Sequence, residues 1–208
     1  MSLYKDASLV MLPSAVKDGK LYSIRPTDGS GDFTFSRGSN LAATRVDVNG
    51  LIEKGRENLL LQSNTFNTSP WISILTTENG GYEGYDGSNN AWLLEKSNSD
   101  GRVYQPVSSS GVQVYSMYAK ANSSDWVYIR ADYSGNIVSK YFHLADGSDG
   151  SSNNIISATK TPIGNGWYRI QIAFNKNITL IRIYPAEGNN DTSGTSGSIY
   201  IQDAQLEQ

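Results

Sequence analysis

The sequence predicts an all-β fold, and three observations lead to this prediction. Short runs that alternate apolar and polar residues recur after Trp71, and clusters of Gly, Asn, Ser and Asp separate them. No window shows the sustained 3.6-residue period of an amphipathic helix. The chain of 208 residues also holds 20 Gly and 13 Tyr, which suit frequent turns and a core of large side chains. Many short strands at regular spacing are typical of a β-sandwich or a β-barrel.

The N-terminal part of the chain predicts an extended arm with a β-hairpin. Residues 9–12 form a short apolar run that a proline stops. Asn49-Gly50 supplies the positive φ angles of a tight type I′ turn between two alternating runs. The arm holds too few apolar side chains to close a core of its own. We therefore expect residues 1–62 to be an assembly or attachment element and residues 63–208 to be a β-sandwich domain.

Nine runs in the second part of the chain predict strands, because each alternates apolar and polar residues between turn signals. They are residues 91–96, 102–107, 112–121, 126–133, 140–144, 155–159, 166–175, 179–185 and 198–205. The glycine-containing clusters at 79–81 and 146–150 are expected to be turns between strands.

Alternation within these runs assigns their side chains to two faces of a sheet. In the run 126–133, Val127, Ile129 and Ala131 form the apolar set and are expected to face the core. The opposite faces mix aromatic side chains with Arg, Lys and Gln. The outward residues that we select as candidate binding residues are Tyr118, Trp126, Tyr128, Arg130 and Tyr184.

This mixture of side chains is the chemistry that a sugar-binding surface needs. A pyranose stacks its apolar C–H face on an aromatic ring, and its hydroxyl groups hydrogen-bond to Arg, Gln, Asp and Asn. Two structural explanations stay open. Outward aromatic residues also stabilise sheets by cross-strand pairing, and Arg over an aromatic ring makes a cation–π contact without any ligand. Strands that alternate between two sheets would place the five residues on opposite faces.

Composition argues against several classes of function. The absence of Cys removes disulfides, thiolate catalysis and Cys-ligated zinc. His143 is the single histidine, and no Gly-x-Ser-x-Gly elbow accompanies it. The net charge of −3 lacks the basic excess of a nucleic-acid binder, and no apolar run is long enough to span a membrane. We expect no catalytic residue, no metal site and no cofactor. Residues 146–153 are Asp- and Gly-rich and could bind calcium through carboxylate and carbonyl oxygens, but they do not match the EF-hand spacing, so an ordinary loop is the favoured interpretation there.

Short motifs also occur in a fixed order along the chain. They are F-S-R at 35–37, A-T-R-V at 43–46, G-L-I-E at 50–53, N-L-L at 58–60, Phe66 and Trp71, and later the runs at 114–121, 164–169, 182–186 and 199–207. This series resembles a domain of many tailed-phage structural proteins, in which such a lead-in precedes a β-sandwich similar to carbohydrate-binding modules. The resemblance covers nearly the whole chain.

The resemblance implies a jelly-roll β-sandwich in a virion structural protein with a head-fibre, tail or receptor-binding role. It implies glycan binding without an enzymatic step, localisation in the virion, and two kinds of partner: a host-surface or mucus glycan and other virion proteins. Unpaired edge strands in the arm further predict a homo-oligomer, with a trimer as the expected state. Two other functions stay open, namely a purely structural virion adaptor or decoration protein without glycan binding, and a depolymerase fragment.

Overall fold

The computed structural model describes residues 7–17, 20–34, 44–46, 52–54, 57–145 and 148–208, and no helix occurs within these ranges. The predicted all-β fold is therefore confirmed. The chain forms two compact units, Met1–Arg45 and Val46–Gln208. Among the described residues, no helix is long and apolar enough to cross a membrane.

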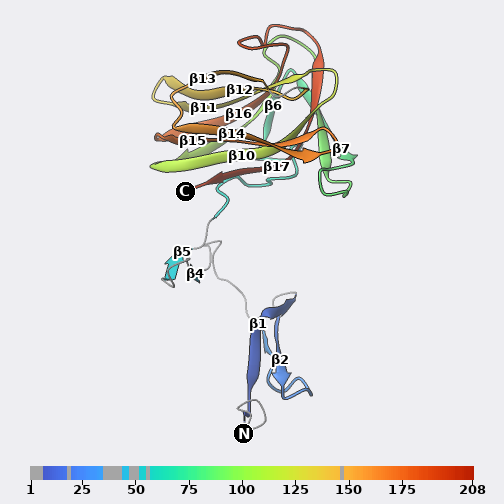
Figure 1. Ribbon diagram of the computed structural model, residues 1–208, viewed down its shortest axis with the longest axis vertical. Helices are drawn as coiled ribbons and strands as arrows, with labels where there is room; N and C mark the ends of the chain where they lie inside the picture. The colour runs from blue at the N-terminus through green and yellow to red at the C-terminus, as the bar shows by residue number, and fades with distance from the viewer. Residues whose placement is uncertain (1–6, 18–19, 35–43, 47–51, 55–56, 146–147) are drawn as a thin grey trace. The chain divides into compact units, whose positions relative to one another are not determined.

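The first unit contains a three-stranded antiparallel sheet with the order β1-β2-β3 (Figure 1). Its strands are β1 (Val10–Lys17), β2 (Lys20–Arg25) and β3 (Phe33–Thr34). The carboxylate of Asp32 accepts a hydrogen bond from the Ser23 amide at 2.8 Å and pairs with Lys20 at 3.0 Å. Strand β1 continues through Pro13, where the sequence predicted a stop. It can do so because β1 is an edge strand, which tolerates the missing N–H of proline.

The predicted hairpin is present as a pair of short strands, β4 (Thr44–Val46) and β5 (Ile52–Lys54), which form a two-stranded sheet. The Asn49-Gly50 turn that the sequence predicts between them lies outside the described residues.

The second unit is a sandwich of two six-stranded antiparallel sheets (Figure 1). Sheet 1 has the order β14-β15-β10-β17-β8-β7, and sheet 2 has the order β13-β12-β11-β16-β9-β6. The chain crosses between the sheets repeatedly, at β8–β9, β9–β10 and β10–β11 and again at β15–β16 and β16–β17, which is the connectivity of a jelly roll. The strand bounds are β6 (Ile72–Ile74), β7 (Thr76–Tyr82), β8 (Ala91–Lys96), β9 (Arg102–Ser109), β10 (Val112–Ala121), β11 (Trp126–Tyr133), β12 (Asn136–His143), β13 (Asp149–Asn153), β14 (Ser157–Gly164), β15 (Trp167–Asn175), β16 (Ile178–Ala186) and β17 (Gly197–Glu207).

The core lies between the two sheets and contains the side chains that the alternation predicted. Val127, Ile129 and Ala131 of β11 are fully buried, as are Ile181 and Ile183 of the neighbouring β16. The facing sheet contributes an equally buried set: Tyr115, Met117 and Ala119 of β10, Ile170, Ile172 and Phe174 of β15, and Ile199 and Ile201 of β17. The predicted inward-facing residues of these five strands are therefore correct.

Three strands lie where no strand was predicted from the sequence. Residues 79–81, expected to be a turn, belong to edge strand β7, and most of the predicted loop 146–153 is edge strand β13. Strand β6 has only three residues. Gly80 lies within β7, and a Cβ there would lie 3.0 Å from the indole of Trp92 on β8. Glycine at this position therefore lets the Trp92 ring pack closely against the strand.

The segment 58–64 packs on the sandwich, although the sequence placed its first residues in the arm. The Leu59 amide donates to the Leu206 carbonyl at 2.8 Å, and the Ala204 amide donates to the Ser63 carbonyl at 2.9 Å. Leu60 is buried in the sandwich core. The boundary after residue 62 thus divides a segment that hydrogen-bonds to β17. An assembly role for the arm stays a prediction.

One buried hydroxyl group in the core leads to a stability prediction. The Tyr115 ring is fully buried, and its hydroxyl has no hydrogen-bond partner among the described residues. Burial also raises the pKa of this phenol. Because a buried unpaired hydroxyl costs about 1–3 kcal/mol, Tyr115→Phe should raise the free energy of unfolding in urea, whereas Tyr115→Ala should lower it by about 3–5 kcal/mol through a cavity. A loss of stability in Tyr115→Phe would mean that the hydroxyl has a partner, such as an ordered water.

Candidate functional site

The outer face of sheet 2 carries four of the five candidate binding residues in adjacent cross-strand rows. In one row, Trp126 of β11 is paired with His143 of β12. In the next, Tyr128 lies between Tyr141 of β12 and Tyr184 of β16, and in the third, Arg130 is opposite Arg182 of β16, which is opposite Tyr104 of β9. Because alternate residues of a strand point to the same side, these side chains share one face.

The aromatic rings of this face, Trp126, Tyr128, Tyr141, His143 and Tyr184, form one cluster. The Trp126 and His143 rings stack with centroids 4.5 Å apart, and the Tyr128 and Tyr141 rings stack at 4.1 Å. Tyr184 packs against the other side of Tyr128, with centroids 5.2 Å apart and planes tilted by 45°. The cluster is therefore a continuous aromatic surface across three strands.

Exposure differs sharply between members of the aromatic cluster. Tyr128 is 7% exposed and Tyr184 is 4% exposed, whereas Trp126, Tyr141 and His143 are partly exposed. Alternation predicted the direction of the Tyr128 and Tyr184 side chains correctly, but their neighbours cover their rings. Of the three aromatic candidates on this face, Trp126 is therefore the one that offers surface to a ligand.

Next to the aromatic cluster lies an arginine group, which consists of Arg102, Arg130, Arg182 and the carboxylate of Asp132. Arg130 Nε lies 2.5 Å from Asp132 Oδ1, and Arg182 Nη2 lies 2.5 Å from Asp132 Oδ2. The Arg102 guanidinium lies 5.7 Å from the centre of the Tyr184 ring, a cation–π distance. Burial raises the pKa of Tyr184, and the charges of the arginines oppose this shift.

The loop 187–196, between β16 and β17, borders the aromatic cluster. The Asn189 side chain accepts a hydrogen bond from the Ser151 amide of β13 at 2.7 Å. A Cβ added to Gly150 would lie 2.8 Å from the Trp126 ring and 2.7 Å from Tyr141 Cβ, so β13 approaches the cluster closely only because this residue is glycine. Loop and edge strand together form a rim at this end of the face.

The position of the loop depends on a buried ion pair. Lys96 of β8 has a fully buried side chain, and its ammonium pairs with the carboxylate of Glu187, which is 26% exposed. The other oxygen of Glu187 accepts a hydrogen bond from the Gly194 amide at 3.0 Å. The loop also contacts the β8–β9 connection, where Thr192 donates to Asp100 at 2.6 Å.

Tyr118, the fifth candidate residue, lies on the outer face of the opposite sheet. It belongs to β10 of sheet 1, and the Tyr85 ring stacks on it with centroids 3.5 Å apart. The Arg169 guanidinium lies 5.6 Å from the same ring. Tyr85 donates a hydrogen bond to Asp203, and burial raises the pKa of both groups. Tyr118 therefore cannot act in one site with the other four residues, and its partly exposed ring is already in contact with Tyr85 and Arg169.

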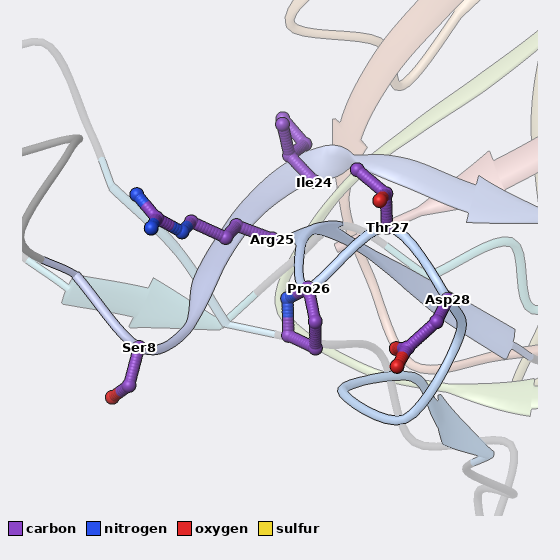
Figure 2. A pocket seen from close by; sticks show the side chains of 6 residues that line it. All are labelled: Ser8, Ile24, Arg25, Pro26, Thr27 and Asp28. Atoms are coloured by element: carbon purple, nitrogen blue, oxygen red, sulfur yellow. The ribbon is translucent and has the colours of Figure 1, made fainter.

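A separate hollow of about 400 Å³ in the first unit is lined by Ser8, Ile24, Arg25, Pro26, Thr27 and Asp28 (Figure 2). The Asp28 carboxylate accepts hydrogen bonds from the amide and hydroxyl of Ser30, which is the bonding of a turn. Figure 2 shows Ser8 and Ile24 pointing away from one another, so the lining groups do not converge on one point. We therefore do not assign a function to this hollow.

Alternation predicted that Asp132 and Arg182 point outward, but the candidate list omitted them, and it also omitted Arg102, Tyr104, Tyr141 and His143 of the same face. Each lies in a predicted strand, but the sequence does not state which strands are neighbours. The pairing of β11 with β12 and β16 brings these side chains together. Within the described part of the chain, no three His, Cys, Asp or Glu side chains are grouped so that they could hold a metal ion.

Among solved structures, the chain is similar to the module TmCBM61, solved with β-1,4-galactotriose, at 17% identity over 72% of this chain and 97% of that chain, with a TM-score of 0.46. It is also similar to the CBM22-1 xylan-binding domain of Paenibacillus barcinonensis Xyn10C, at 12% identity over 74% and 96% of the two chains, with a TM-score of 0.43. The enzymatically active domain of bacteriophage CBA120 tailspike protein 4 matches at 14% identity over 72% of this chain and 21% of that chain, with a TM-score of 0.42. No protein-family model and no curated protein matches the sequence. At these scores the assignment of the site rests on its own geometry.

The buried pair of Lys96 and Glu187 yields a stability prediction for the rim. Among the described residues, Glu187→Ala would leave the buried Lys96 ammonium with one long hydrogen bond, to the Thr192 carbonyl at 3.4 Å. Breaking a buried pair from one side costs about 3–5 kcal/mol, and the partial exposure of Glu187 favours the lower end. Urea unfolding should show this loss, while Glu95→Ala, at an exposed position of the same strand, should change stability little. The double variant Lys96→Met/Glu187→Ala should recover much of the loss. Equal stability of Glu187→Ala and Glu95→Ala would contradict the role of the pair.

Proposed function

We propose that this protein is a non-enzymatic glycan-binding protein and that the outer face of sheet 2 contacts the sugar. The observation that carries the proposal is the placement of partly exposed aromatic rings beside hydrogen-bonding side chains in adjacent rows of one sheet. Trp126 and Tyr141 belong to the aromatic rows, and Arg130, Arg182 and Tyr104 form the neighbouring row. All five side chains are partly exposed.

The spacing of these rows suits a sugar ring. Successive outward residues of a strand lie about 7 Å apart, and neighbouring strands lie about 5 Å apart. A pyranose that packs against Tyr141 can therefore reach the guanidinium groups of the next row with its hydroxyl groups. Trp126 lies one row further away, about 14 Å along the strand from Arg130, so it would pack against a second sugar ring of the same glycan. In the same row, the buried Tyr128 ring stacks on Tyr141 and packs against Tyr184, so the exposed Tyr141 ring is held by its neighbours. Such a rigid arrangement lowers the entropic cost of binding.

The state of the carboxylates supports the absence of an enzymatic step. Glycoside hydrolysis uses two carboxyl groups that flank one glycosidic bond. In the rows described here, Asp132 is bound by two guanidinium groups. At the rim, Asp100 accepts a hydrogen bond from Thr192, and Asp191 accepts hydrogen bonds from Ser193. Each carboxylate therefore has a structural partner.

For the biological setting, we propose a virion structural protein of a tailed phage, with a head-fibre, tail or receptor-binding role. The ordered series of motifs from 35–37 to 199–207 supports this proposal. The partners would be a host-surface or mucus glycan and other virion proteins. In this account the N-terminal residues assemble the protein into a homo-oligomer, with a trimer as the expected state, and the sandwich displays the glycan-binding face.

Glycan binding can be tested with a glycan array and two aromatic variants on opposite faces. The wild-type protein should bind a subset of the array. Trp126→Ala should weaken that binding by about tenfold or more, since stacking on one ring is worth about 1–3 kcal/mol by analogy with base stacking. Tyr118→Ala should bind like the wild type. Thermal unfolding of all three proteins serves as the control, with Ile129→Ala, a core cavity variant, as the destabilised reference.

If the wild type binds no glycan, the structural adaptor or decoration role is favoured instead. If Tyr118→Ala alone loses binding, the site lies on sheet 1.

Oligomerisation can be tested by light scattering on the full chain and on a variant that lacks residues 1–45. The deletion retains the whole second compact unit. We expect the mass of a trimer for the full chain and the mass of a monomer for the deletion variant, because the arm would supply strand edges for pairing between chains. A full chain that is monomeric at high concentration would rule out self-assembly through the arm.

A further inference from the structure

We infer that the glycan bound by the sheet 2 face is anionic, carrying a carboxylate or sulfate group that is bound by Arg130 and Arg182. This inference rests on the proposed glycan-binding function and specifies its ligand class. It follows from the charge of the arginine group and from its unpaired hydrogen-bond donors. A site that binds only neutral hydroxyl groups does not require an excess of positive charge.

The two arginines are direct cross-strand neighbours. Arg130 of β11 is opposite Arg182 of β16 in the register, and like charges in this position destabilise a sheet. Asp132 lies between them and binds one nitrogen of each, at 2.5 Å on both sides. One carboxylate therefore serves two guanidinium groups, and the pair keeps an excess of one positive charge.

Arg102 adds a further positive charge to the same face. Its Nη1 donates to the Asp100 carbonyl at 2.9 Å, and its guanidinium lies over the Tyr184 ring. Neither contact supplies a negative charge. The arginine group thus holds three guanidinium groups and one carboxylate. The loop carboxylates of Asp100 and Asp191 act on Tyr141, at the aromatic side of the face.

Many donors of the arginine group have no partner in the described part of the chain. A guanidinium has five N–H donors. Arg130 uses Nε on Asp132, while Arg182 uses Nη2 on Asp132 and Nη1 on the Tyr184 hydroxyl at 3.4 Å. The Nε atoms of Arg102 and Arg182 are buried without a hydrogen-bond partner. Both Arg130 and Arg182 are partly exposed, with side-chain exposures of 29% and 20%, so a ligand can approach the exposed parts of the two guanidinium groups, although not the buried Nε of Arg182.

An oxyanion on the glycan would both pair with the free guanidinium donors and balance the excess positive charge. Carboxylate and sulfate oxygens accept charge-assisted hydrogen bonds from guanidinium forks and neutralise the excess charge of the arginine pair. The aromatic rows begin about 7 Å along the strands from the arginine row, a distance that one sugar ring spans. The ring would then lie on the aromatic surface while its acidic group reaches Arg130 and Arg182.

The first test uses an array that contains neutral, uronic-acid, sialylated and sulfated glycans. Binding only to anionic members is expected. Binding to neutral members at equal strength would overturn the inference and leave the proposed glycan-binding function intact. No binding to any member would overturn both.

The second test compares the best array ligand with its neutral counterpart, carboxyl-reduced or desulfated, by titration calorimetry. The wild type should bind the neutral form at least about tenfold more weakly, because hydrogen bonds to charged groups are the stronger ones. Arg130→Gln and Arg182→Gln should each weaken binding of the anionic form by a similar factor, and should weaken binding of the neutral form by a clearly smaller factor, because only a hydrogen bond to a neutral hydroxyl group is then lost. Raising the salt concentration should weaken wild-type binding to the anionic form.

Arg169→Gln, on the outer face of sheet 1, is the matched control and should bind the anionic form like the wild type. Circular dichroism verifies that each variant is folded. If either glutamine variant fails to fold, Arg130→Lys keeps the charge but loses the planar fork, and it should still bind the anionic form more weakly than the wild type. Unchanged affinity of the folded arginine variants for the anionic form would overturn the inference.

Discussion

The pairing register of β11 is the constraint on which both the core and the candidate site depend. This strand is hydrogen-bonded along nearly its whole length to β12 on one side and to β16 on the other. Because side chains alternate, a shift of one residue would exchange the buried row of Val127 for the outward row of Tyr128. The apolar residues that fill the sandwich therefore also fix which residues form the outer face.

The outer face of sheet 2 has two parts with different stabilisation. Its aromatic cluster buries Tyr128 and Tyr184 almost completely, so these residues act as a second, small core outside the sandwich. Its arginine group instead places two guanidinium groups side by side and relies on one carboxylate, Asp132, to hold them. The first part would stabilise the protein in the absence of any ligand. The second part keeps an unbalanced charge, which is the feature that suggests a specific partner.

The sequence was a good guide to strands and faces and a poor guide to neighbours. Strands β8, β10 and β11 have the predicted bounds, since each has clear alternation between strong turn signals. Strands β7 and β13 were missed because Gly-rich edge strands look like turns, and the reason for Gly80 and Gly150 is visible only in the side chains that pack against them. Tyr118 and Trp126 lie on the outer faces of opposite sheets. Alternation within a strand does not predict this, because it does not state to which sheet a strand belongs. The burial of Tyr128 could not be predicted for the same reason.

The central claim, that the outer face of sheet 2 binds the glycan, is tested most directly by an NMR titration. A ¹H–¹⁵N spectrum recorded with increasing amounts of the best array ligand reports which residues sense it. We predict shifts of the Trp126 indole N–H, of the Arg130 and Arg182 Nε–H groups, and of the backbone amides of β11, β12 and β16 around them. Shifts confined to Tyr85, Tyr118 and Arg169 on sheet 1 would contradict this assignment and place the binding site on the opposite face.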